Sequence, residues 1–184
     1  MNDNQFDIAM TMNTLDDLLK ATDLNDVTSE SSGFDDLPAG YYLSEVNSAE
    51  LTISKNSGNP QVKVVFKIVE DGVTVEPDDV GNMVRKNLPK TAGRLIFKYY
   101  PLKDEKTVRT MVSDMTKFEG EVKGEPLLPK EYFKETSLLN EALACLTGFR
   151  IYVNISTSTN KEGKTNNWVN LISWKRAAQL DLAE

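Results

Sequence analysis

The chain has 184 residues, 40% of them hydrophobic, which is enough for one domain with a hydrophobic core, or one domain and a tail. It has no histidine and one cysteine, Cys145, which excludes an internal disulfide, Ser-His-Asp or Cys-His catalysis and an ordinary four-ligand zinc site. Its apolar runs are far shorter than the roughly 20 residues that cross a bilayer, and its polar, acidic start is unlike a secretory signal. We therefore expect a soluble, intracellular protein without a metal or another cofactor.

The net charge of −7 is concentrated near the N-terminus. Nine acidic residues and one lysine lie between Met1 and Leu37, so this leader carries −8 and the remaining chain +1. The body is therefore nearly neutral. Bases gathered on one of its faces can still form a positive groove for a polyanion.

The leader, residues 1–36, is predicted to be largely flexible, with one short helix. Residues 14–20 have an amphipathic pattern, with Thr14 as the N-cap and acidic residues in the first turn. Residues 28–33 are small and polar and read as a linker.

The body is predicted to run from residue 37 to residue 174, followed by a short C-terminal tail over 175–184. Aromatic and β-branched residues with period-two alternation predict its strands, and apolar residues at helical spacing predict its helices. An irregular acidic stretch is expected after the turn at Glu70-Asp71-Gly72, and Gly148 is expected to end the second helix. The expected strands are Tyr41–Ile53, Gln61–Val69, Asn82–Leu88, Arg94–Tyr100, Phe149–Ser156 and Asn167–Trp174, and the expected helices are Asp104–Phe118 and Ser137–Leu146.

This order predicts a mainly β fold with helical insertions. A five-stranded barrel of the OB type, with the helices inserted before the last strands, accommodates it. A two-layer β-sandwich is the alternative architecture.

Bases interleaved with aromatic residues mark the strand faces that we expect to point outward. Lysine and arginine neutralise phosphates, and exposed rings stack on unpaired bases for about 1–3 kcal/mol each. Single-stranded nucleic acid is the ligand that this pattern favours. The candidate binding residues are Lys63, Lys67, Arg85, Lys86, Arg94, Lys98, Tyr100, Arg150, Tyr152 and Trp168.

Other interpretations of these residues remain open. Lysines on strands often protect sheet edges, and tyrosines often lie partly in a core. A protein-interaction module that docks through the acidic leader is the first rival function. A Mg²⁺-dependent nuclease using Asp78 and Asp79 is the second, although paired acids in polar loops are usually solvated. We expect no catalytic activity.

Two segments of the body carry a family resemblance. Residues 37–42 read LPAGYY, and residues 49–69 read AELTISKNSGNPQVKVVFKIV. With TGFRIYV at residues 147–153 and the polar hairpin after it, this pattern resembles phage-encoded OB-fold single-stranded DNA-binding proteins. The resemblance covers about half of the chain, discontinuously, and the acidic leader departs from it.

The resemblance implies a protein that coats or protects single-stranded DNA in phage DNA replication or recombination, largely without sequence preference. It also implies work in the cytoplasm of a bacterial host cell. Partners among replication or recombination proteins would then be recruited through the acidic leader.

Overall fold

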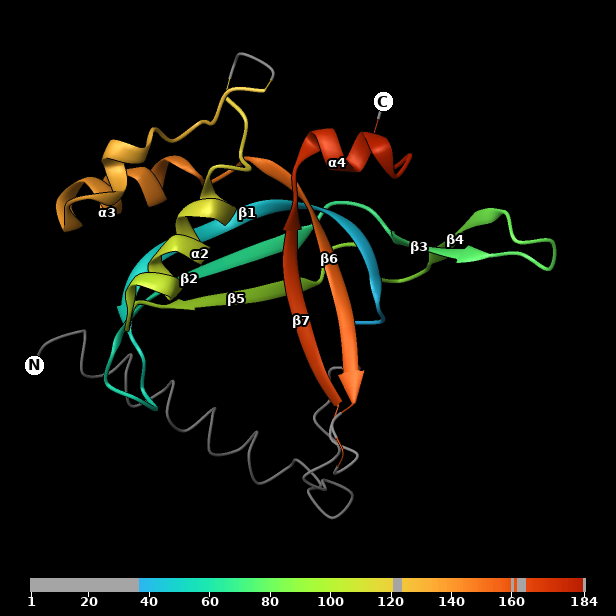
Figure 1. Cartoon of the computed structure of the whole chain (residues 1–184), viewed down its shortest axis with the longest axis horizontal. Coiled ribbons are helices and arrows are strands. Elements are labelled where there is room, and N and C mark those ends of the chain that lie inside the picture. The colour runs from blue at the N-terminus through green and yellow to red at the C-terminus, as the bar shows by residue number, and fades with distance from the viewer. Residues whose placement is uncertain (1–36, 121–123, 160, 162–164, 184) are drawn as a thin grey trace, which may run out of the picture. The chain divides into compact units, whose positions relative to one another are not determined.

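The computed structural model describes residues 37–120, 124–159, 161 and 165–183 (Figure 1). The predicted leader, with its helix over residues 14–20, lies outside the described residues. Beyond it, residues 37–184 form one compact unit. The strands are β1 (Gly40–Ile53), β2 (Pro60–Ile68), β3 (Gly72–Pro77), β4 (Met83–Leu88), β5 (Leu95–Pro101), β6 (Arg150–Thr159) and β7 (Thr165–Ile172). The helices are α2 (Glu105–Met115), η1 (Lys130–Phe133), α3 (Thr136–Cys145) and α4 (Trp174–Gln179).

All the paired strands are antiparallel, and β1 is the strand that joins them. Its first half pairs with β6 from Gly40 to Glu45, and the stretch from Ser44 to Ile53 pairs with β2. One branch of the sheet continues from β2 to β5, a second from β6 to β7, and a third from β1 through β3 to β4. The prediction of a mainly β fold with helical insertions is confirmed. Among the described strands, however, no hydrogen-bonded ladder joins β5 to β7, so the sheet is open rather than a closed barrel.

β1 contains a bulge between Val46 and Ser48. Glu45 lies opposite Lys67 before the bulge, and Glu50 lies opposite Lys63 after it. Side chains alternate along a strand, so two residues an odd number apart normally face opposite sides. The bulge inserts one residue, which places Glu45 and Glu50 on the same face.

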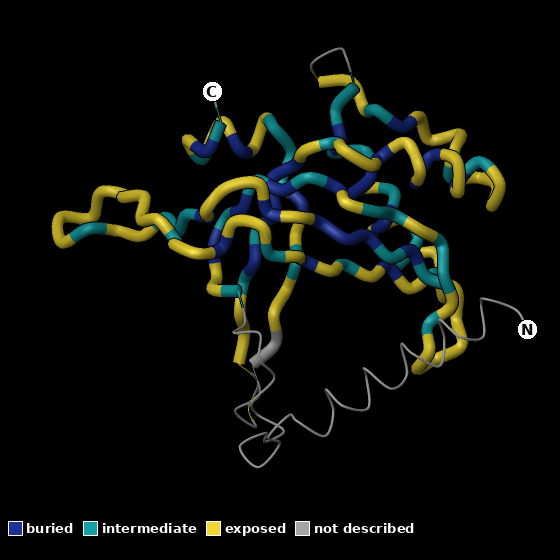
Figure 2. Tube along the Cα trace, turned by 180° about the vertical axis from the view of Figure 1, so that it is seen from behind, coloured by how far each residue is buried: buried dark blue, intermediate teal, exposed yellow. Residues whose placement is uncertain are grey.

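The main core lies between the inner faces of the strands and the helices α2 and α3. Tyr42, Phe66 and Phe118 are its largest buried side chains. Figure 2 shows the buried segments running through the middle of the domain. The β3–β4 hairpin extends away from the rest of the domain in Figure 1 and Figure 2, and β4 is exposed over nearly its whole length.

The helices of the body follow from local sequence signals. α2 begins after Asp104, whose Oδ1 accepts a hydrogen bond from the Thr107 backbone N–H at 2.8 Å. This reciprocal cap satisfies amide groups that would otherwise lack partners. α3 ends just before Gly148, which takes a φ of 86° that few other residues adopt. Both helices lie within three residues of their predicted ends.

Two elements depart from the sequence analysis. The stretch expected to be irregular forms β3, which pairs with β4 along six residues. Gly72 begins β3 at a close approach to β1, since a Cβ at this position would overlap the ring of Tyr42. The segment expected to be a tail forms α4, and Ala177 and Leu182 pack there with Tyr152 in a second, smaller core.

Candidate nucleic-acid interface

β5 carries apolar side chains on both of its faces. Ile96 and Tyr100 point into the core, whereas Leu95, Phe97 and Tyr99 point outward. Phe97 is 47% exposed and Tyr99 is 51% exposed. Large aromatic side chains lose favourable burial when they remain in water, so two of them side by side on a strand mark a candidate binding surface.

The outward residues of β5 lie beside two lysines of β2. Tyr99 is directly opposite Lys63, Phe97 is opposite Val65, and Leu95 is opposite Lys67. On the other side of β2, the same register places Glu50, Ser48 and Glu45 of β1. We call the surface formed by these nine residues the three-strand face. It has an acidic column on β1, a basic column on β2 and an apolar, aromatic column on β5.

The two lysines of the three-strand face differ in their surroundings. The Nζ of Lys63 lies 3.2 Å from the Oε1 of Glu50. Lys67 is exposed, and among the described residues no carboxylate lies within 4.0 Å of its ammonium. With Glu45 and Gly93, Lys67 lines a shallow hollow of about 220 Å³. The Nε of Arg150 on β6 binds the Oε2 of Glu45 at 3.3 Å, so this base stands next to the acidic column.

Lys98 and Tyr100 were predicted to point outward, and this orientation is wrong. Tyr100 is only 3% exposed, and its hydroxyl donates to the Oδ2 of Asp114 on α2 at 2.9 Å. Burial, reinforced by the Asp114 carboxylate, raises the pKa of Tyr100 well above its usual value. Lys98 lies 3.4 Å from the same carboxylate, and burial lowers its pKa. Neither side chain can contact a nucleic acid on the outer face.

The same carboxylate organises the boundary between β5 and β7. The Nζ of Lys117 binds the Oδ1 of Asp114 at 2.6 Å and donates to the Leu171 carbonyl of β7 at 2.9 Å. Lys98 donates to the Val169 carbonyl of β7. Lys98 on β5 and Lys117, just after α2, therefore both reach the edge of β7, where the described strands form no ladder of backbone hydrogen bonds. We call this arrangement the lysine seam.

Tyr152 was predicted as a stacking residue and is covered instead. It points outward from β6 as expected, but α4 packs over it and leaves it 8% exposed. Its ring meets that of Trp174 edge to face, with 5.4 Å between the centroids, and its hydroxyl donates to the Leu182 carbonyl. Burial, as the main cause, raises the pKa of Tyr152. The stacking role of Tyr152 is therefore a wrong prediction.

The other predicted residues lie away from the three-strand face. Arg85 and Lys86 belong to β4, at the opposite end of the strand order from β5. Arg85 donates to the Asp181 carbonyl at 2.7 Å, and Lys86 pairs with Glu76 at 2.8 Å. Arg94 immediately precedes β5 and is half-buried. Trp168, on β7, is 58% exposed and donates from its indole to the Ser158 hydroxyl at 2.8 Å. It remains a candidate for stacking.

Phe97 and Tyr99 were not among the predicted binding residues. Side chains alternate along a strand, so the prediction that Lys98 and Tyr100 point outward implied that Phe97 and Tyr99 point into the core. The signal that could have identified them was that β5 has apolar residues at both its odd-numbered and its even-numbered positions. One apolar face of such a strand must either meet a second layer or stay exposed.

The two aspartates proposed for a nuclease, Asp78 and Asp79, lie at the turn between β3 and β4. The Oδ1 of Asp78 accepts hydrogen bonds from the backbone N–H groups of Val80 and Asn82, at 2.9 and 2.8 Å. The hydrogen bond from Asn82, as the largest cause, lowers the pKa of Asp78. Within the described ranges, no three acidic or cysteine side chains gather closely enough to hold a metal ion.

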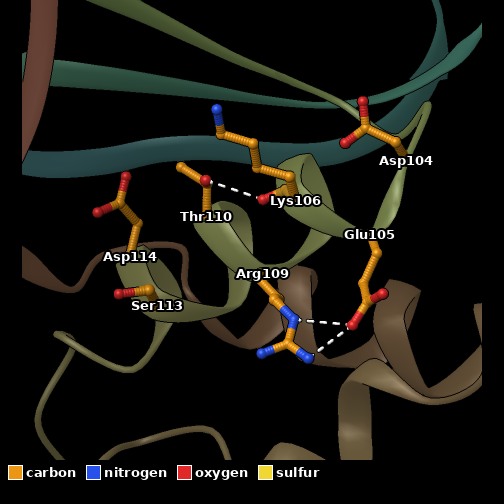
Figure 3. Close-up of a pocket in the computed structure, with 7 residues that line it drawn as sticks. All are labelled: Asp104, Glu105, Lys106, Arg109, Thr110, Ser113 and Asp114. Carbon is orange, nitrogen blue, oxygen red and sulfur yellow. Dashed lines mark hydrogen bonds and ion pairs between the residues drawn. The ribbon is translucent and has the colours of Figure 1, made fainter.

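A hollow of about 710 Å³ lies along α2. Figure 3 shows that its lining side chains come from this helix and its N-cap, and that Arg109 bonds with Glu105. Since all the described lining residues belong to α2 and its N-cap, this hollow is an open helix surface. The lining residues are Asp104, Glu105, Lys106, Arg109, Thr110, Ser113 and Asp114.

Over residues 21–87 the chain is similar to a family described as "Protein of unknown function (DUF669)". This stretch includes β1, β2 and the two lysines of the three-strand face, and it ends before β5. No curated protein matches the chain. Of the helices that the structure describes, none is both long and apolar enough to span a bilayer.

Proposed function

We propose that this protein binds single-stranded DNA on the three-strand face, without catalysis and largely without sequence preference. The observation that carries the proposal is the pair of exposed rings, Phe97 and Tyr99, beside Lys63 and Lys67. Aromatic rings stack on any unpaired base, whereas lysines bind the phosphates. A role in coating or protecting single-stranded DNA during phage replication or recombination would follow from such binding.

The spacing of the two rings favours an unpaired, extended strand. Residues two apart on an antiparallel strand lie about 7 Å apart, which is twice the roughly 3.4 Å between stacked bases of a duplex strand. Bases that rest on Phe97 and Tyr99 would therefore be separated from each other. A duplex hides the flat faces of its bases and cannot offer them to these rings.

An OB-type arrangement of the strands is part of the same proposal. The ladders run from β5 through β2 to β1 and from β1 through β6 to β7. Joining β5 to β7 through the lysine seam would complete a ring of five strands. The helices α2 and α3 lie between β5 and β6 in the chain, where the OB-type reading expects the helical insertion.

Removal of both rings tests the proposal. Phe97→Ala/Tyr99→Ala should weaken binding to a fluorescently labelled oligo-dT at least about thirtyfold, because each stacked base is worth about 1–3 kcal/mol. Tyr132→Ala is the matched control, since Tyr132 is an exposed aromatic residue on η1, outside this face. Anisotropy titrations with duplex competitor measure the effect, and circular dichroism checks that the variants fold. Equal affinity of the double variant and the control would reject this site.

Trp168 is tested separately, because it lies on β7 rather than on the three-strand face. If it adds a stacking platform, Trp168→Ala should weaken oligo-dT binding by about fivefold or more. An unchanged isotherm would remove Trp168 from the site and leave the three-strand face intact.

A protein-interaction module is the second candidate function, and the pairing of the bases favours it. Lys63, Lys86 and Arg150 each bind a glutamate, which reduces the positive potential of the outer surface. The exposed apolar column of β5 would then contact a protein. Absence of oligonucleotide binding even at low salt would favour this module, with the acidic leader as a further place to search for a partner.

A further inference from the structure

We propose that Glu50 limits the affinity of the three-strand face by occupying Lys63, so that a phosphate must displace this carboxylate in order to bind. The inference rests on the proposed binding of single-stranded DNA. It assigns a regulatory part to the acidic column, which the proposed function leaves unexplained.

Each glutamate of the acidic column forms an ion pair with a base. Glu50, Lys63 and Tyr99 form one row across β1, β2 and β5, and the carboxylate of Glu50 lies 3.2 Å from the ammonium of Lys63. At the other end of the column, Glu45 holds Arg150 at 3.3 Å. The bulge in β1 brings both carboxylates to this face. A regular strand would leave only one of them there.

An ion pair on such a surface is readily exchanged. Exposed pairs contribute about 0–1 kcal/mol, because water and salt screen them. A phosphate can therefore replace the carboxylate on Lys63. The released Glu50 then remains about one strand spacing from the phosphate, roughly 5 Å along the sheet, and like charges at that distance repel each other. Both effects lower the affinity.

The columns also orient the ligand. Repulsion from β1 keeps phosphates over the lysines of β2, and the rings that accept bases lie on the other side of β2, on β5. A bound strand would then run along β2 and β5, with its bases turned away from β1. Lys63 and Lys67, four residues apart, are about 14 Å apart, a span of roughly two extended nucleotides.

The test is Glu50→Gln, which keeps the shape of the side chain and removes its charge. We expect about threefold to tenfold tighter binding to oligo-dT at low salt. The dependence of log K on log salt should become steeper by about one phosphate contact, because Lys63 then binds phosphate without releasing a carboxylate. Glu105→Gln is the matched control, since Glu105 pairs with Arg109 on α2 and lies outside this face.

A second background separates occupancy of Lys63 from a general charge effect. In a Lys63→Met protein, Glu50→Gln should produce no gain beyond that of Glu105→Gln. A gain that persists in this background would overturn the inference, as would a Glu50→Gln affinity equal to that of the control. If the wild-type protein binds no oligo-dT at any salt concentration, the proposed function fails instead, and this inference falls with it.

Discussion

Replacement of Asp114 should destabilise the domain strongly, because this carboxylate holds the lysine seam together. Its side chain is only 10% exposed, and it binds Lys98, Lys117 and the hydroxyl of Tyr100. Asp114→Asn preserves the shape of the side chain and removes the negative charge. Two ammonium groups then remain close together, one of them 15% exposed, without a counter-ion.

The size of this effect follows from the burial of the pair. Removing one partner of a buried ion pair costs about 3–5 kcal/mol, because the remaining charge stays desolvated. A domain of this size has a total free energy of unfolding of about 5–15 kcal/mol. A loss of 3 kcal/mol should lower Tm by about 6–12 °C.

Urea unfolding followed by circular dichroism measures the loss. Glu105→Gln on the same helix should change the free energy of unfolding by less than about 0.5 kcal/mol, because its ion pair with Arg109 is exposed. Adding Lys98→Met to Asp114→Asn should recover part of the stability, since it removes an unpaired charge. A loss below about 1 kcal/mol for Asp114→Asn would refute the view that the seam is held by charge.

Three further predictions concern other parts of the chain. The Tyr42 hydroxyl donates to the Pro38 carbonyl, and burial raises the pKa of Tyr42 to about 12, so the folded state keeps a proton that the unfolded chain releases near pH 10. The free energy of unfolding should therefore fall by about 3 kcal/mol as the pH rises from 10 through 12. In urea unfolding, Tyr42→Phe should lose less stability over that pH range. Gly72→Ala should lower the free energy of unfolding by about 1–3 kcal/mol, because its Cβ would overlap the Tyr42 ring. In the same assay the control Gly120→Ala, whose Cβ would make ordinary contacts, should lower it by less than about 1 kcal/mol. Equal losses for the two variants would contradict this explanation. Removal of residues 1–36 changes the net charge from −7 to +1, so oligo-dT, a polyanion, should bind more tightly at low salt. An unchanged affinity in anisotropy titrations would show that the charge of the leader does not act on binding.

The elements with a single clear pattern were predictable. Val62, Val64, Phe66 and Ile68 alternate with Lys63, Val65 and Lys67 along β2, so the two lysines were assigned to the outer face, where they lie. α2 and α3 had apolar residues at helical spacing, and Gly148 marked the end of α3. β3 was missed because its alternating pattern is short: Glu76 and Pro77 follow its two valines. Its pairing with β4 depends on the folded structure and cannot be read from the local sequence.

The candidate site was harder to predict than the fold. On β5, residues at odd-numbered and even-numbered positions are apolar, so alternation did not identify the outer face. The one lysine among them, Lys98, suggested the wrong face. Lys98 can lie inside only because Asp114 supplies its counter-charge from another element, which no local pattern indicates. Tyr152 has the predicted direction, but α4 covers it. In both cases a partner distant in sequence decides which side chain remains available for binding.

The bulge of β1 makes chain length, and not only residue type, a determinant of the surface. It absorbs one residue, so a strand without Asn47 would be regular, with Glu45 and Glu50 four residues apart and still on one face. Ala49 and Leu51 would continue to pack against the core. Loss of the bulge without loss of a residue would do the opposite, because Ala49 and Leu51 would turn to solvent and the carboxylate of Glu50 would turn inward. This strand should therefore tolerate the deletion of Asn47 far better than the insertion of a further residue there.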